Sequence, residues 1–273
     1  MFRFQPFAYP PVSDFRTGYT MLIKQLLTLH GNFLFRWRSY LPLLLLPVFV
    51  AAAPESVRVE QAMVNGWSAA WTCICLAVAF LGLAIRVAVV GYVPAGTSGR
   101  NVHEQRAEHL NTTGLYSVVR NPLYLGNFVG LIGFVAATRV WWLAVIGSLV
   151  YWLYIERIIA AEEEFLERKF GKQYVDWASK TPAFMPRLSG WTKPNMPFSL
   201  RTVLRREYNG LFTLGAVFFM WSAFVDLIIE NKSVSAWVHE DYALMALFLA
   251  TFGAFVVLRF LKKHSRLLHE PGR

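Results

Sequence analysis

Six apolar stretches recur along the chain, separated by short polar segments. A helix needs about 20 apolar residues to cross the hydrocarbon core of a bilayer. The stretches that meet or approach this length are residues 34–53, 67–93, 123–138, 140–156, 208–229 and 241–260. The pattern predicts an all-α fold, a polytopic transmembrane helical bundle with about six spans.

Three of the predicted spans depart from the simple case. Pro42 and Pro47 interrupt the first one, because proline lacks the amide hydrogen that a helix interior uses. The third and fourth are short and are separated only by Thr138 and Arg139, which predicts a tight helical hairpin. The two open ends of such a hairpin must lie close together on one side of the membrane.

The segment before the first span is amphipathic. Apolar side chains recur at helical spacing between Tyr19 and Leu34, opposite Thr20, Lys24 and Thr28, which predicts a helix in the cytoplasmic interface. Prolines after residue 181 mark an irregular linker before the last two spans. We therefore divide the chain into an interfacial segment (1–33), two spans with their loop (34–107), a core with the short hairpin (108–190), and a linker with a C-terminal transmembrane hairpin (191–273).

Composition and charge agree with this topology. Apolar residues make up 55% of the 273 residues and charged residues only 16%, below the quarter that is usual for soluble domains. Of the 27 Lys and Arg residues, 23 fall in segments 1–40, 94–122, 157–207 and 259–273. The positive-inside rule places these segments in the cytoplasm, and the bacterial inner membrane is favoured over the endoplasmic reticulum.

Several functional classes find no support in the sequence. Basic and aromatic residues are not interleaved in a stripe, so nucleic acid is not an expected partner. Cys73 and Cys75 lie in an apolar run without a third ligand at metal spacing, and we interpret them as packing residues and expect no metal site. Residues 1–11 lack the basic and apolar regions of a cleaved signal peptide.

Two polar stretches flank the predicted hairpin and carry the candidate chemistry. The first runs from Leu110 to Gly126, where Asn121 followed by Pro122 predicts the start of a helix whose free amide groups face the cytoplasm. Such a helix start is a favourable seat for a carboxylate or phosphate. The second runs from Arg157 to Trp177 and is strongly acidic at its beginning. The hairpin should bring both stretches into one cytoplasmic-side pocket.

Together these stretches resemble the superfamily of isoprenylcysteine carboxyl methyltransferases and phospholipid N-methyltransferases. The shared pattern is Gly-x-Tyr-x3-Arg-(His/Asn)-Pro-x-Tyr-x-Gly, followed by Arg-x4-Glu-Glu-x-Phe-Leu-x3-Phe-Gly-x2-Tyr and a proline-rich tail, over about 80 of the 273 residues. The resemblance implies an integral membrane enzyme that wraps S-adenosylmethionine in this region. It also implies a lipid or lipid-like methyl acceptor that enters laterally from the bilayer.

The resemblance implies roles for individual residues. Arg157 and Glu162 match the arginine and glutamate that organise acceptor and methyl donor, although they lie about 140° apart on a straight helix, so that either the helix bends or the pair lines two walls of one groove. Asn121 stands where many members have histidine, so a proton acceptor is missing there. The residues matching the cofactor-binding motif are Tyr116, Arg120, Asn121, Pro122, Tyr124, Leu125, Gly126 and Glu163.

Three classes of methyl acceptor are compatible with the sequence. An anionic headgroup is favoured, because Arg100, Arg106, Arg120 and Arg157 converge on the pocket side, and such a headgroup would be held by an arginine fork. A phospholipid amine would instead need Glu162 to take a proton. A prenylcysteine carboxylate is the third possibility.

Two other functions are considered. A nicotinamide-dependent sterol-type reductase of similar architecture is disfavoured by the acidic pair Glu162 and Glu163, which would repel a nucleotide phosphate. A non-enzymatic transporter or scaffold is disfavoured because the informative residues cluster at one surface.

Three features remain ambiguous. Arg86 is either a functional cation within the membrane, or its long side chain extends to the cytoplasmic membrane interface. Gly126 and Gly130 suit close helix packing as well as cofactor approach. The polar loop at residues 96–101 is a hypothetical gate for the acceptor headgroup.

Overall fold

The computed structural model describes residues 23–38, 40–64, 66–94, 96–97 and 107–273. Among these residues, helices are the regular elements, and one isolated bridge joins Gly114 to Thr192. The helices are α1 (Ile23–Trp37), η1 (Leu41–Leu45), α2 (Leu46–Ala62), α3 (Trp67–Val90), η2 (Leu115–Ser117), α4 (Pro122–Ala137), α5 (Trp141–Phe170), α6 (Lys172–Ala178), η3 (Leu188–Gly190), α7 (Leu200–Phe224), η4 (Val225–Ile229), α8 (Val234–Glu240) and α9 (Tyr242–His264).

Five helical segments in the described part of the chain are long and apolar enough to cross a membrane. These are Leu41–Ala62, Trp67–Val90, Trp141–Phe170, Leu200–Ile229 and Tyr242–His264. The third predicted span, at 123–138, corresponds to α4, which is apolar but has only 16 residues. The predicted all-α, multi-pass membrane fold is confirmed.

The predicted bounds of the first span are wrong. We expected residues 34–53, but α1 ends at Trp37 and the apolar helical segment extends from Leu41 to Ala62. Pro42 and Pro47 do not interrupt this segment, because each occupies the first turn of a helix, where a missing amide hydrogen does no harm. The proline inside α2 is Pro54.

The helix expected before the first span exists from Ile23 onward, and residues 19–22 of that prediction lie outside the described residues. It crosses α5 at very close range. A β-carbon on Gly31 would lie only 1.9 Å from the carbonyl oxygen of Arg157 and 2.9 Å from the Ala161 β-carbon. Glycine at this position therefore allows α1 to pack directly against the part of α5 that leads into the acidic stretch.

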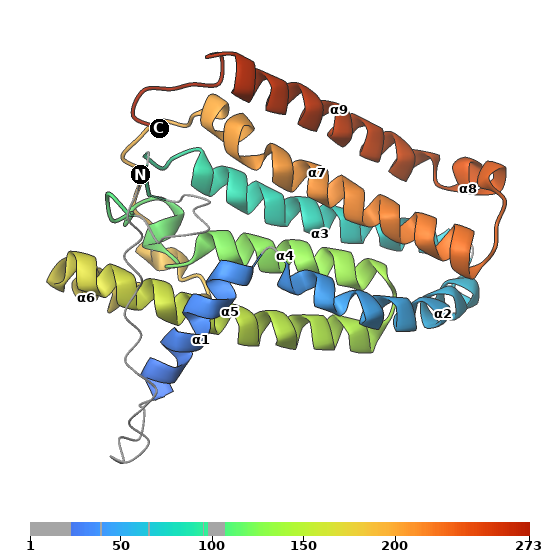
Figure 1. Ribbon diagram of the computed structural model, residues 1–273, viewed down its shortest axis with the longest axis horizontal. Helices are drawn as coiled ribbons and strands as arrows, with labels where there is room; N and C mark the ends of the chain where they lie inside the picture. The colour runs from blue at the N-terminus through green and yellow to red at the C-terminus, as the bar shows by residue number, and fades with distance from the viewer. Residues whose placement is uncertain (1–22, 39, 65, 95, 98–106) are drawn as a thin grey trace, which may run out of the picture.

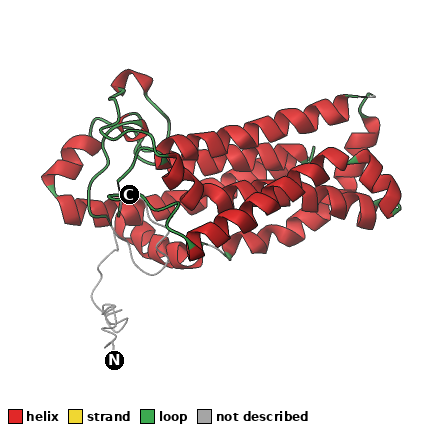
Figure 2. Ribbon diagram, turned by 90° about the horizontal axis from the view of Figure 1, so that it is seen from above, coloured by secondary structure: helices red, strands yellow, loops and turns green. Residues whose placement is uncertain are grey.

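Helices α3, α7 and α9 run side by side, and α4 and α5 lie along the other flank of α3 (Figure 1). Loops gather at one end of the bundle, near α6 and the C-terminus, whereas the opposite end has short turns (Figure 2). The linker from α6 to α7 and the segment before α4 both belong to the loop-rich end. The architecture thus concentrates irregular backbone where the candidate residues are found.

The contact between α3 and α4 depends on glycine. A β-carbon on Gly133 would lie 2.6 Å from both the Ala79 nitrogen and the Cys75 oxygen, and one on Gly82 would lie 2.5 Å from the Gly126 oxygen. Small residues allow two helix backbones to approach closely inside a membrane. Gly126 is therefore explained by helix packing, whatever further role it has.

Replacing Gly133 by alanine should lower the free energy of unfolding by about 1–3 kcal/mol, because the added methyl group forces the two backbones apart. Thermal unfolding in detergent measures the effect. Gly253→Ala is the matched control, since outside the adjoining backbone of α9 itself no described atom lies within 4 Å of a β-carbon added to that glycine. Equal losses in both variants would contradict the close-packing explanation.

Candidate active site

The two stretches singled out in the sequence meet at the loop-rich end. The Tyr124 hydroxyl, in the first turn of α4, donates to Glu162 Oε1 of α5 at 2.7 Å. The Tyr151 hydroxyl, three turns earlier in α5, donates to the Tyr124 carbonyl oxygen at 2.7 Å. The short hairpin therefore brings the start of α4 and the acidic part of α5 into direct contact, as the spacing predicted.

Arg120 joins three parts of the site. Its Nε donates to Glu163 Oε1 at 2.8 Å, and its Nη1 donates to the carbonyl oxygens of Ala178 and Thr181, each at 2.8 Å. Its backbone nitrogen donates to the Pro182 oxygen at 2.8 Å. The guanidinium is only 18% exposed. These bonds fix the loop after α6 against both α5 and the segment that enters α4.

Asn121 and Pro122 begin α4 as predicted, but the Asn121 side chain does not cap the helix. Its Nδ2 instead donates to the Ala183 carbonyl oxygen at 3.0 Å. Asn121 is therefore the N-cap residue of α4 by position, as predicted, but without a side-chain capping bond. The physical reason is that the 178–183 loop holds the Asn121 side chain. The backbone amide groups in the first turn of α4 therefore make no hydrogen bond with it.

Tyr116 lies just before α4, in η2. Burial, and then the negative charge of Glu162, raise the pKa of its phenol to about 12, and a hydrogen bond with Asn111 opposes the shift. The phenol thus stays protonated near neutral pH. The Trp177 indole donates to the Tyr116 carbonyl oxygen at 3.2 Å, which connects η2 to α6.

Tyr174 supports the site from α6. Burial, and then the Glu163 carboxylate, raise the pKa of the Tyr174 phenol, while the Arg120 guanidinium opposes the shift. Its ring lies 5.7 Å from the Trp177 ring, measured between centroids. The short helix α6 thereby covers the pair formed by Arg120 and Glu163.

A cleft of about 170 Å³ opens beside Tyr116. Gly114 bends its wall with a φ of +62°, a backbone conformation that favours glycine. Its lining combines apolar residues, polar side chains and the rings of Tyr92 and Tyr116, a composition that suits a ligand with both a flat heterocycle and hydroxyl groups. Its lining comprises Ala88, Val89, Tyr92, Val93, Pro94, His109, Leu110, Asn111, Thr112, Thr113, Gly114, Leu115, Tyr116, Asn195 and Met196.

Arg157 occupies a different position from Glu162, although both lie in α5, which is a continuous helix. Arg157 donates to the Leu153 carbonyl oxygen of its own helix, and its backbone faces Gly31 of α1. The cation that acts electrostatically on Glu162 is Arg38, directly after α1. The described residues thus show no contact between Arg157 and Glu162, and the role assigned to Arg157 stays a prediction.

Part of the predicted pocket falls on the loop between α3 and η2. Arg100, Arg106 and most of the hypothetical gate at 96–101 lie outside the described residues. Within that loop, the Gly96 carbonyl oxygen accepts a hydrogen bond from the Glu108 amide at 3.1 Å.

Arg86, about one turn before the end of α3, is paired with a buried carboxylate between the helices. Its Nε and Nη2 donate to the two carboxylate oxygens of Glu207 in α7, each at 2.8 Å, and its Nη1 donates to Asn127 Oδ1 in α4 at 2.7 Å. Glu207 is only 5% exposed. Both Arg86 and Arg206 of α7 act electrostatically on Tyr116. The C-terminal hairpin thus contributes charges next to the site, which sequence spacing alone did not reveal.

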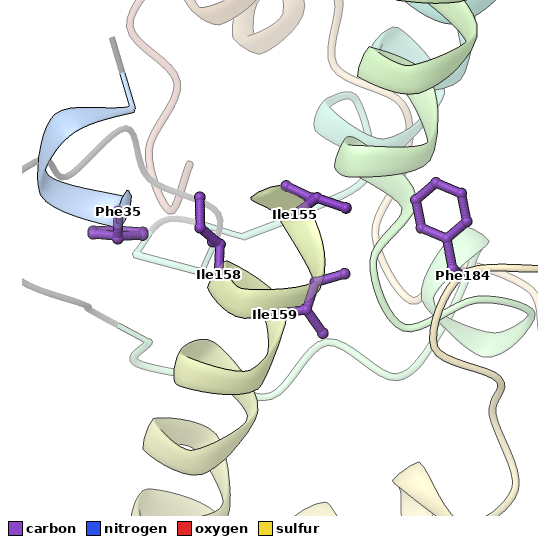
Figure 3. Close-up of a cluster of buried hydrophobic side chains, with 5 residues drawn as sticks. All are labelled: Phe35, Ile155, Ile158, Ile159 and Phe184. Atoms are coloured by element: carbon purple, nitrogen blue, oxygen red, sulfur yellow. The ribbon is translucent and has the colours of Figure 1, made fainter. Parts of the chain in front are cut away.

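An apolar cluster forms another wall. Phe184, from the loop after α6, faces Ile155 and Ile159 of α5, and Phe35 of α1 lies beside Ile158 (Figure 3). Tyr124 and Leu125 pack against the same cluster. The polar contact between Tyr124 and Glu162 therefore borders a hydrophobic surface, so the site can face both a charged group and an apolar chain.

Comparisons with known proteins agree with the sequence pattern. Residues 70–173 match the phospholipid methyltransferase family. The chain is 39% identical over 126 residues to the nickel-cobalt-cadmium resistance protein NccN of Alcaligenes xylosoxydans xylosoxydans, which covers 45% of this chain and 55% of that protein. It is 31% identical over 96 residues to protein-S-isoprenylcysteine O-methyltransferase B of Arabidopsis thaliana, covering 33% of this chain and 49% of that protein.

A further relative is the cobalt-zinc-cadmium resistance protein CzcN of Cupriavidus metallidurans, 31% identical over 124 residues, which are 45% of this chain and 55% of that protein. The chain spans about half the length of these curated relatives. No solved structure matches it. In the part of the chain that the structure describes, no group of three or more His, Cys, Asp and Glu side chains could hold a metal ion. The predicted resemblance to the methyltransferase superfamily is confirmed for the central segment.

Proposed function

We propose that this chain is an integral membrane methyltransferase that transfers a methyl group from S-adenosylmethionine to a lipid or lipid-like acceptor. The observation that carries the proposal is the contact between the two motif stretches, made by Tyr124 with Glu162 and by Arg120 with Glu163. The match of residues 70–173 to phospholipid methyltransferases and the similarity to isoprenylcysteine methyltransferases support the reaction class. The apolar spans support a membrane-embedded acceptor.

The residues around the cleft fit such a methyl donor. S-adenosylmethionine supplies an electrophilic methyl group on a positively charged sulfonium, next to an adenosine and an amino-acid carboxylate. Tyr116 and Asn111 line the cleft and would hold the polar parts, and the carboxylates of Glu162 and Glu163, which are not among the lining residues, would favour the positive charge. The uncapped amide groups at the start of α4 suit the donor's carboxylate.

Displacement at a methyl group requires alignment and electrostatics from the protein, with no covalent enzyme intermediate. Tyr124 orients Glu162 through its hydrogen bond, and Arg120 balances the charge of Glu163 while it fixes the 178–183 loop. If the acceptor is an amine, Glu162 takes its proton; if the acceptor is an anionic oxygen, no base is needed. Asn121 cannot serve as a base, because its amide does not accept protons near neutral pH.

The acceptor would approach from the bilayer along the apolar cluster around Phe184 and Ile159. Arg38, which acts on Glu162, is a candidate to hold an anionic headgroup, in place of Arg157. We place this end of the bundle at the cytoplasmic face because it carries most of the basic loops. The two resistance proteins come from bacteria, which agrees with a bacterial inner membrane.

Labelled-methyl transfer into a total lipid extract tests the proposal. Purified protein incubated with labelled S-adenosylmethionine should yield a lipid heavier by one methylene group, identified by mass spectrometry. Glu162→Gln should lower the rate by about 100-fold, in line with the loss of a positioned catalytic group. Glu164→Gln is the matched control, because Glu164 pairs only loosely with Arg168, at 3.6 Å. Absence of any labelled lipid, with oxidation of a reduced nicotinamide cofactor instead, would refute the proposal.

A further inference from the structure

A second pocket, lined by basic side chains, lies where α7 begins and α9 ends. Its volume is about 480 Å³. Arg205 comes from the first turns of α7, Lys262 from the last turn of α9, and the other lining residues from the turn that follows. The lining comprises Arg205, Lys262, Ser265, Arg266, Leu268 and His269, none of which lines the cleft beside Tyr116.

The cations of this pocket are not neutralised by acidic side chains of the described residues. Arg205 donates to the Arg273 carbonyl oxygen, and Lys262 lies 5.3 Å from the centre of the Tyr208 ring. The nearby Glu270 accepts a hydrogen bond from the Ser199 hydroxyl. Arg205 thus faces a main-chain oxygen of the last residue, whereas Lys262 and Arg266 add positive charge that no acidic side chain of the described residues offsets, which favours an anion.

The opposite end of the same two helices shows a cation that the chain neutralises with its own carboxylates. Lys232 there contacts three carboxylates, those of Asp226, Glu230 and Glu240, at 2.7–3.1 Å. Their negative charge raises the pKa of Lys232 against the effect of burial, so the ammonium is held by fully paired contacts. The basic pocket lacks such compensation, and the difference points to an external ligand.

The surface next to the pocket is apolar and open. Only 6% of the most apolar window of α9 is buried within the protein. Phe252, Val256 and Phe260 are exposed along this helix, and Leu267 is exposed in the turn beside the pocket. An acyl chain lying on α9 would therefore bring its headgroup to Lys262 and Arg266. A free phosphate ion would gain nothing from this apolar face.

We propose that the basic pocket binds the phosphate headgroup of an anionic phospholipid whose acyl chains lie along α9. Basic pockets between transmembrane helices on the cytoplasmic side are suited to such headgroups. The lipid would anchor the C-terminal hairpin and is distinct from the methyl acceptor, because no residue of the basic pocket belongs to the apolar cluster along which the acceptor would approach. The inference does not depend on the proposed methyltransferase activity.

Native mass spectrometry of the full chain tests this site. Protein in detergent is offered equal amounts of phosphatidylglycerol and phosphatidylcholine, and phosphatidylglycerol should be retained at least tenfold better. The double variant Arg205→Gln with Arg266→Gln should lose most of this preference, about tenfold or more, since each basic residue near an anionic headgroup contributes severalfold. Lys263→Gln is the matched control, because Lys263 is an exposed α9 cation that does not line the pocket.

Three outcomes would overturn the proposal. Equal retention of the two lipids would show that the pocket does not select an anion. An equal loss in Lys263→Gln would show that only general surface charge matters. Displacement of phosphatidylglycerol by millimolar inorganic phosphate would identify a phosphate site without a role for acyl chains. Unchanged thermal unfolding of the double variant separates loss of the site from loss of the fold.

Discussion

Replacing Arg120 by alanine should reduce the rate of labelled-methyl transfer by about 100-fold, equivalent to about 2.7 kcal/mol of lost transition-state stabilisation. The change removes three side-chain hydrogen bonds, to Glu163, Ala178 and Thr181. The Glu163 carboxylate would then lack its partner, and the 178–183 loop would no longer be fixed to α5. Initial rates and the affinity for S-adenosylmethionine measure the effect.

Two further substitutions separate the contacts of Arg120 from a general effect of its positive charge. Arg120→Lys keeps the positive charge but not the planar fork, so it should recover only part of the activity. Arg168→Ala should stay within about 0.5 kcal/mol of the unsubstituted protein, because an exposed ion pair contributes little. Arg168 is 68% exposed and pairs with Glu164 on the same helix. Full activity in Arg120→Ala would show that its contacts do not organise the site.

Breaking the pair between Arg86 and Glu207 should cause the largest loss of stability in the protein. Removing one partner of a buried ion pair costs about 3–5 kcal/mol, because the other charge stays buried without compensation. Arg86 is 17% and Glu207 5% exposed, and two hydrogen bonds of 2.8 Å connect them. Arg86→Met and Glu207→Leu should therefore each lower the unfolding temperature in detergent markedly.

The double variant Arg86→Met with Glu207→Leu should lose less than the sum of the two single losses, since neither charge is then left alone. Arg58→Met is the matched control, because Arg58 is exposed and bonds only to a carbonyl oxygen of its own helix. Strictly additive losses would contradict a coupled pair. Arg86 also acts electrostatically on Tyr116. A reduced affinity for S-adenosylmethionine in the single variants would therefore show that the pair supports the methyl-donor site as well as the fold.

Much of the fold follows from the sequence because membrane spans leave a strong local signal. The starts of α3, α4, α5 and α9 lie within one residue of the predicted ones. The first span was misplaced because apolar side chains at the end of α1 precede it in sequence, whereas α2 continues through Glu55, Arg58 and Glu60, where an apolar pattern no longer marks the helix. The helix α5 continues beyond the predicted span 140–156 to Phe170, through charged residues where an apolar pattern no longer marks it.

The site could be predicted only where its residues are close in sequence or joined by the short hairpin. That reasoning correctly brought Tyr124 near Glu162 and Arg120 near Glu163. It could not place Arg38, whose position depends on how α1 crosses α5 at Gly31.

Glu207 was missed for a similar reason. It is a single acidic residue near the start of α7, and its partner Arg86 is 121 residues earlier in the chain. Only the packing of α7 against α3 brings these two side chains together. A buried carboxylate at the end of an apolar span is a weak sequence signal, but it could have indicated a partner for the intramembrane cation.

Calorimetric titration of the detergent-solubilised protein with S-adenosylmethionine tests the central claim most directly. The claim is that the start of α4, the acidic part of α5 and the 178–183 loop together form a methyl-donor site. The account predicts one binding site per chain with micromolar affinity, weakened in Arg120→Ala and unchanged in Arg168→Ala. No binding at millimolar S-adenosylmethionine by protein that is folded would contradict it.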